Sequence, residues 1–200
     1  MQSLSKFRKP PSNKAMGIEI ETVLPKGFNI PYGSYLNFFY VTRDGSIYHD
    51  YDLERGVEFV SQPLTPVWLK REIHKLYNRV NGWDNNNTCG IHIHVSRKWL
   101  SSEKASVIYK WLQSLTESEQ INLFGRTDNG YCSYVERFAS TRYAAINVEN
   151  EHTIEFRMFR SGDNEWACYC VDMVEYLVQN AYKLNLDAAY AFRDMKLGNT

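Results

Sequence analysis

Three segments of the chain alternate apolar and polar residues, the period of two that places successive side chains on opposite faces of a β-strand. Residues 15–23 read AMGIEIETV, residues 90–97 read GIHIHVSR, and residues 153–160 read TIEFRMFR. Residues 36–41 and 57–60 are shorter strand candidates. We therefore predict a sheet with one apolar face and one face rich in glutamate and histidine.

Two turns are expected to join neighbouring strands. Asp44-Gly45, at the centre of residues 43–46, has the chemistry of a tight hairpin turn. Residues 142–149 are expected to form a strand joined to the strand at 153–160 by a turn at 150–152. Several strands that are polar on one side indicate an antiparallel sheet.

Apolar residues at helical spacing predict helices between and after these strands. Thr65 followed by Pro66 is a typical helix start, and Ser118 and Asp163 are expected caps of later helices. The expected helices cover residues 66–80, 102–115, 118–125, 163–181 and 187–195. The predicted class is α+β, with an antiparallel sheet and helices packed on its apolar face.

Composition narrows the partners and the compartment. The chain has 200 residues, a formal net charge of zero and 23% charged residues, so charge gives no support for nucleic-acid binding. No apolar run is long enough to cross a bilayer, and the N-terminus lacks the apolar core of a signal peptide. We expect a cytoplasmic protein with no membrane partner, in which residues 1–14 form a flexible arm and residues 15–200 a single catalytic domain.

The four cysteines do not have the spacing of a zinc or redox motif. They are Cys89, Cys132, Cys168 and Cys170, and no two of them form a CxxC pair. Cys168 and Cys170 lie two apart in a helical pattern, which places them on opposite sides of the helix. Reduced thiols are expected.

The polar sides of the strands carry the candidate chemistry. They hold Glu19, Glu21, Glu58, His92, His94, Glu155 and Arg157. Four acids on one surface raise one another's pKa unless a cation offsets them, and oxygen-rich sites with an occasional imidazole suit Mg²⁺ or Mn²⁺. An ordinary exposed stripe is the simpler alternative, but such faces more often carry Thr and Lys.

Two alternatives remain at the level of single residues. His92 and His94 with a third ligand could hold a catalytic zinc ion, as in a metal-dependent hydrolase. Arg157 could form a simple salt bridge with Glu155 or bind a phosphate through its planar fork, a role that Arg142 and Arg160 could share.

The motifs, taken in order, resemble the amidoligase family of glutamine synthetase-like carboxylate–amine ligases, which is related to glutamate–cysteine ligase. The matching segments are residues 17–21, 44–46, 58–64, 90–95, 145–148 and 153–157. The resemblance spans residues 16 to about 161. It implies a curved antiparallel sheet like the glutamine synthetase catalytic domain, whose concave face holds ATP and two or three Mg²⁺ ions.

The resemblance also implies roles for residues and a reaction. The implied metal ligands are Glu19, Glu21, Glu58, His92 and Glu155. The implied catalytic residues are Arg157, Arg142 and Glu58, and the implied nucleotide contacts are Arg157, Arg160, Arg126 and His94. The expected reaction phosphorylates a carboxylate with ATP, and an amine then displaces phosphate from the acyl phosphate.

The resemblance leaves the substrates and the assembly open. Small-molecule or peptide carboxylates and amines are the expected partners. Closed rings occur in the superfamily, so the resemblance is compatible with a homo-oligomer. Residues 125–141 are the candidate lid over the site. A protein that keeps this fold for binding or structure without catalysis is the remaining alternative.

Overall fold

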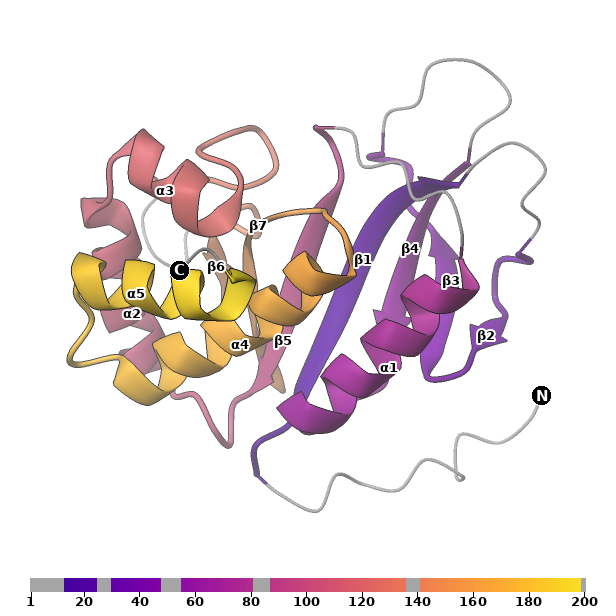
Figure 1. Cartoon of the computed structure of the whole chain (residues 1–200), viewed down its shortest axis with the longest axis horizontal. Helices are drawn as coiled ribbons and strands as arrows, with labels where there is room; N and C mark the ends of the chain where they lie inside the picture. The colour runs from indigo at the N-terminus through magenta and orange to yellow at the C-terminus, as the bar shows by residue number, and fades with distance from the viewer. Residues whose placement is uncertain (1–12, 25–29, 48–54, 81–86, 136–140, 199–200) are drawn as a thin grey trace.

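The computed structural model describes residues 13–24, 30–47, 55–80, 87–135 and 141–198. Within these residues it has an α+β fold with one antiparallel sheet and five helices (Figure 1). All but the last two residues of the expected N-terminal arm, residues 1–14, lie outside the described ranges. The predicted fold class is confirmed at this level.

The described sheet has seven strands, and each adjacent pair is antiparallel. The strands are β1 (Met16–Leu24), β2 (Tyr35–Leu36), β3 (Phe39–Arg43), β4 (Arg55–Ser61), β5 (Gly90–Ser96), β6 (Ile146–Asn147) and β7 (Thr153–Arg160). Their order across the sheet is β2-β3-β4-β1-β5-β7-β6. The central strands β1 and β5 are therefore two of the segments whose alternation is clearest in the sequence.

The helices bury the apolar side of the sheet. They are α1 (Pro66–Arg79), α2 (Ser102–Ser114), α3 (Glu117–Phe124), α4 (Asn164–Asn180) and α5 (Leu186–Leu197). In Figure 1, α1 and α4 lie across the sheet, and α5 packs on α4. Ile18, Ile20, Ile91 and Ile93 are at most 1% exposed. No helix in the described ranges has the length and apolar composition of a membrane span.

Two helix starts follow from local sequence. Thr65 precedes α1, and Pro66 occupies its first turn, as the sequence predicts. The expected cap of α3 at Ser118 is wrong, because Thr116 caps the helix. Thr116 Oγ1 accepts a hydrogen bond from the Glu119 backbone, and the Glu119 carboxylate accepts one from the Thr116 backbone. This reciprocal capping box satisfies two otherwise free backbone donors.

The sequence overestimates two strands and one hairpin. The run at 36–41 is broken by Asn37, whose φ of 56° turns the chain between β2 and β3. The strand expected at 142–149 is reduced to β6, because Tyr143 O and Ala145 N bond to Ser133 instead of to β7. Asp44 makes the expected turn with Ser46, but β4 begins only at Arg55, so the connection is longer than a tight hairpin.

Candidate functional site

The strand register places the predicted polar residues beside one another. Glu19 of β1 is the Cα partner of His92 on β5, and Glu21 is the partner of Glu58 on β4. On the other side of β5, His94 is the partner of Glu155 on β7. Partners on adjacent strands lie about 5 Å apart, so four separate segments of sequence form one surface.

These side chains line a cavity of about 390 Å³. Nine of the ten predicted site residues contribute to it: Glu19, Glu21, Glu58, His92, His94, Arg126, Arg142, Glu155 and Arg157. Arg160 does not. It is exposed at the end of β7 and lines a separate hollow with Gly125 and Trp166.

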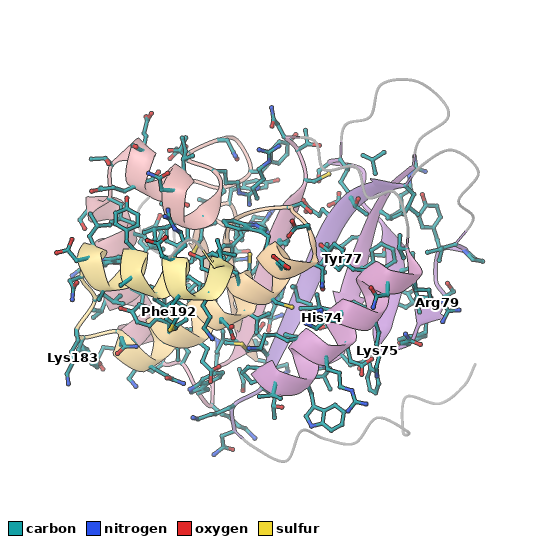
Figure 2. The ribbon with its side chains drawn as sticks, viewed as in Figure 1. His74, Lys75, Tyr77, Arg79, Lys183 and Phe192 are labelled. Atoms are coloured by element: carbon teal, nitrogen blue, oxygen red, sulfur yellow. The ribbon has the colours of Figure 1, made fainter. Side chains whose placement is uncertain are left out.

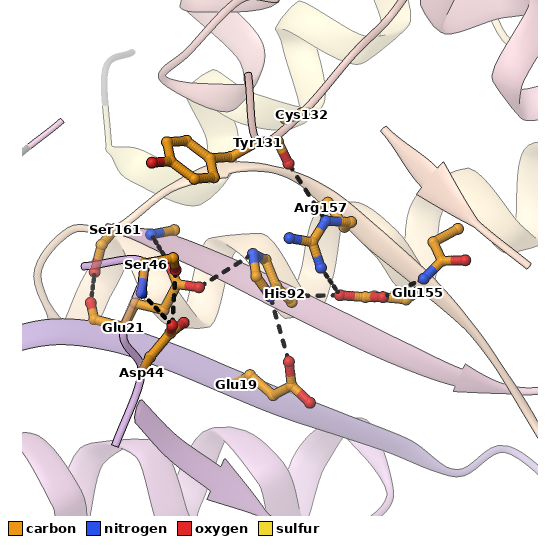
Figure 3. Close-up of polar contacts among 12 residues, drawn as sticks. Glu19, Glu21, Asp44, Ser46, His92, Tyr131, Cys132, Glu155, Arg157 and Ser161 are labelled. Carbon is orange, nitrogen blue, oxygen red and sulfur yellow. Dashed lines mark hydrogen bonds and ion pairs between the residues drawn. The ribbon is translucent and has the colours of Figure 1, made fainter. Parts of the chain in front are cut away.

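His92 lies at the centre of the acidic groups, where it is 3% exposed. Figure 3 shows its ring between Glu19 and Glu155, with Nδ1 3.3 Å from Glu19 Oε2 and 3.4 Å from Glu155 Oε1. Its Nε2 lies 3.7 Å from Glu21 Oε1. A single buried imidazole therefore contacts three carboxylates from two strands.

Glu155 and Arg157 form an ion pair along β7. Arg157 Nη1 lies 2.5 Å from Glu155 Oε1, and Asn147 Nδ2 donates to Glu155 Oε2 at 2.8 Å. Arg157 Nε is 3.4 Å from the carbonyl oxygen of Tyr131 (Figure 3). The expected salt bridge between Arg157 and Glu155 is thus present, and the same guanidinium also lines the cavity.

Burial and neighbouring carboxylates raise the pKa values of the buried acids, whereas contacts with the histidines lower them. Burial raises the pKa of Glu58 to about 9, and the nearby carboxylates of Glu19, Glu21 and Asp44 reinforce this shift. Burial alone would raise the pKa of Glu19, but hydrogen bonds to His92 and His94 outweigh it and lower that pKa well below its usual range.

His94 and Glu21 show the same competition. Burial lowers the pKa of His94, but its contact with Glu19 (Nε2 to Oε1, 2.9 Å) outweighs burial and raises it. Burial raises the pKa of Glu21, although the Gly90 backbone donates to its Oε2 at 2.6 Å. Without a bound cation, Glu58, Glu21 and His94 therefore each keep a proton to a higher pH than these groups ordinarily do.

We expect the cation-free protein to lose stability as the pH rises from about 5 to about 9. The pKa of Glu58 is higher in the folded than in the unfolded state, so the folded state binds more protons across this window and its advantage shrinks with increasing pH. The raised pKa of His94 acts in the same direction. Thermal denaturation in a chelator should show a fall of several degrees, and Glu58→Gln should flatten the slope.

The matched control for this slope is Glu149→Gln, because Glu149 also lines the cavity but is exposed. That variant should keep the wild-type slope. An unchanged slope in Glu58→Gln would show that Glu58 does not hold the proton.

Among the described residues, three groups of side chains offer ligand atoms within 4.8 Å of one another. They are Glu19–His94–Glu155, Glu19–Glu58–His92 and Glu21–Asp44–Glu58. Glu19 and Glu58 are each shared by two groups, so the three positions are adjacent. Each group contains two or three carboxylates and at most one histidine, which suits Mg²⁺ or Mn²⁺. His92 and His94 belong to different groups, so this arrangement does not favour a zinc ion held by both.

Several lining residues have no assigned role in the sequence prediction. Asp44 reads as an ordinary turn residue, yet its side chain lines the cavity and completes the third group. The available signal is its position just after β3, which pairs with β4 at Thr42 and Glu58. Asn147 is the strand partner of Glu155. The other lining residues without a predicted role are Ser46, Thr88, Tyr131, Tyr143 and Glu149.

The cavity also has a basic side. Arg126 is 8% exposed, and its Nη2 donates to the backbone oxygen of Arg157. Its Nε is buried without a hydrogen-bond partner among the described residues. Gly90 leaves room for it, because a Cβ there would lie 2.9 Å from Arg126 Nη1 and 3.2 Å from His92 Nε2. Arg142 lies at the exposed rim, over the ring of Tyr143.

Comparison of the chain with protein-family models, curated proteins and solved structures found no match. The chemistry of the cavity is therefore what indicates its function. Its three distinguishing features are the shared carboxylates, the buried imidazole and a buried guanidinium with spare donor capacity.

Proposed function

We propose that the protein is an ATP-dependent carboxylate–amine ligase of the amidoligase type, with a glutamine synthetase-like catalytic sheet and a multi-Mg²⁺ site. The observation that carries the proposal is the row of three adjacent ligand groups that share Glu19 and Glu58. A surface stripe of acids would not need to share ligands or bury an imidazole among them. Shared ligands of this kind suit a site for several neighbouring divalent cations.

The donor chemistry fits Mg²⁺, and also Mn²⁺. The ligand atoms are carboxylate oxygens from β1, β4, β7 and the turn after β3, with one imidazole of β5 in each of two groups. Glu19, Glu21, Glu58, His92 and Glu155 would hold the cations, and Asp44 joins this set. The raised pKa of Glu58 supports the same assignment, because a divalent cation would replace the proton that crowding otherwise retains there.

The arginines fit the anionic part of a nucleotide or an activated carboxylate. A buried guanidinium with an unpartnered donor is costly unless an anion pairs with it, and Arg126 is in that position. Arg157, fixed by Glu155, presents a second guanidinium on the same wall. These two residues would hold phosphoryl oxygens, with Arg142 as a contact at the rim. Arg160 has no part in this proposal, because it lies outside the cavity.

ATP bound with Mg²⁺ would supply a transferable phosphoryl group and the charge neutralisation that its transfer to a carboxylate requires. The chain's own contribution is positional. Glu155 is held by Asn147 and Arg157, so its oxygens are fixed before any ligand binds. Glu58, whose pKa burial and the neighbouring carboxylates raise, would give up its proton when it holds a cation. His94, held between Glu19 and Thr153, supports Glu19 and is available to a cation or to a phosphate oxygen.

Calorimetry with a non-hydrolysable ATP analogue tests this function. We expect binding in the presence of Mg²⁺ and its loss when the cation is chelated, together with phosphate release from ATP when carboxylates and amines are supplied. The ligase proposal is rejected if the protein binds no nucleotide and releases no phosphate with any substrate mixture. Tightly bound stoichiometric zinc in the purified protein, measured by elemental analysis, would instead favour a hydrolase.

A further inference from the structure

A second chemical cluster lies away from the cavity, between the outer surfaces of α1 and α4. Cys168 Sγ of α4 is 3.7 Å from Nε2 of His74 on α1, and His74 Nδ1 is 2.7 Å from the carboxamide of Asn164. Figure 2 labels His74 on α1. A nucleophile, a base within reach and a third group that orients the base are the components of an activated thiol.

We propose that Cys168 is a site of reversible S-thiolation, in which His74 removes the thiol proton and Asn164 orients His74. The site is independent of the proposed ligase function, since neither hollow includes these residues. Cys168 is partly exposed, whereas Cys89, Cys132 and Cys170 are 0% exposed. Of the four thiols, Cys168 is therefore the one that a dissolved reagent can reach in the folded protein.

The surroundings explain why a base is needed. Burial raises the pKa of the Cys168 thiol to about 11, Lys70 on α1 acts against this, and Asp172 and Glu165 on α4 reinforce it. At neutral pH the resting group is therefore the thiol, and solvent alone seldom removes its proton. The exposed imidazole of His74 is the neighbouring group that can accept this proton.

The contact with Asn164 determines which ring nitrogen can accept that proton. Asn164 Oδ1 is buried and has no hydrogen-bond partner in the described structure, while its Nδ2 faces His74 Nδ1. Turning the carboxamide over presents Oδ1 to a proton on Nδ1. Nε2 then lacks a proton and accepts one from Cys168.

The exchange balances without a further reagent. His74 Nε2 takes the thiol proton while Cys168 Sγ attacks one sulfur of a small disulfide. The S–S bond of that disulfide breaks, a new S–S bond joins it to Cys168, and the departing thiolate recovers the proton from the imidazolium. The products are one mixed disulfide on the protein and one free small thiol.

Oxidised glutathione is the probe, and intact-protein and peptide mass spectrometry provide the readout. Wild-type protein should gain one adduct, on Cys168, at a rate that rises through the pH range in which imidazoles lose their proton. His74→Ala should slow the reaction about tenfold or more at neutral pH and move the rise toward the thiol's own ionisation. Asn164→Ala should be slower than wild type, and Asn164→Asp, which still accepts from Nδ1, should retain the rate.

The matched control is His152→Ala, which removes an exposed histidine from the turn before β7. It should react as wild type does, and all variants should react alike when unfolded in denaturant. The proposal is overturned if His74→Ala keeps the wild-type rate and pH profile. It is equally overturned if the folded protein forms no adduct or forms it at another cysteine.

Discussion

Glu19→Gln is expected to abolish Mg²⁺-dependent nucleotide binding and to reduce any ligase turnover more than about 100-fold. Glu19 belongs to two of the three ligand groups, so one substitution weakens two adjacent cation positions. It also contacts both histidines, at 3.3 Å from His92 and 2.9 Å from His94. Glutamine keeps the size of the side chain but removes the charge that cations require.

Calorimetry with Mg²⁺ and a non-hydrolysable ATP analogue measures this effect, with Glu149→Gln as the control. Glu149 lines the same cavity and undergoes the same chemical change, but it is exposed and belongs to none of the three groups. It should bind nucleotide within about threefold of wild type. Undiminished nucleotide binding by a folded Glu19→Gln variant would show that Glu19 is not a cation ligand of the proposed site.

The sequence was sufficient to predict the two-faced sheet because the alternation is strict over residues 16–21 of β1 and throughout β5. Ile18 and Ile20 on one side and Glu19 and Glu21 on the other leave a single register that buries the apolar set. Once that register is set, Glu19 meets His92 directly across the strands. Pattern alone thus predicts that the two side chains share a face, while their distances and shared contacts come from the fold.

The sequence could not predict what depends on irregular backbone. Along β7 the register shifts opposite Ile91 and Ile93, and both Met158 and Phe159 are buried in succession. This irregularity places Phe159 in the core beside Met158, although strict alternation after Arg157 would put Phe159 on the polar side. Arg160 lies at the exposed end of the strand and lines the separate hollow. Asp44 shows the converse case: a turn residue, without any periodic signal, reaches the cavity because the turn lies next to β4.

Arg126 and Tyr131 are two further lining residues whose positions the sequence pattern could not predict. Both line the cavity from the segment expected to form a lid, of which residues 136–140 lie outside the described structure. Arg126 follows the left-handed Gly125 that ends α3, and this reversal lets its side chain reach the Arg157 backbone on β7. A short FGR segment contains no periodicity from which such a path could be predicted.

The largest effect on stability is expected from Phe156→Ala, at about 3–5 kcal/mol of unfolding free energy. Phe156 is 0% exposed and is the strand partner of both Ile93 and Ile146, so its removal leaves a cavity under three strands. For a chain of this size, the loss corresponds to a fall in Tm of roughly 10 °C. Urea unfolding of the cation-free protein measures it, and Phe156→Leu, which keeps most of the buried side chain, should lose less than half as much.

The same variant separates the two faces of β7. Glu155 and Arg157 flank Phe156 but point to the polar side, where their ion pair and the Asn147 contact do not involve the aromatic ring. Below its lowered Tm, Phe156→Ala should therefore bind Mg²⁺ and nucleotide with nearly wild-type affinity. Loss of binding in the folded variant would mean that the core side of β7 determines the position of Glu155, and that the helices under the sheet influence the site. Retained binding would show that the hydrogen bonds and ion pairs of the polar face are sufficient to hold the ligands in place.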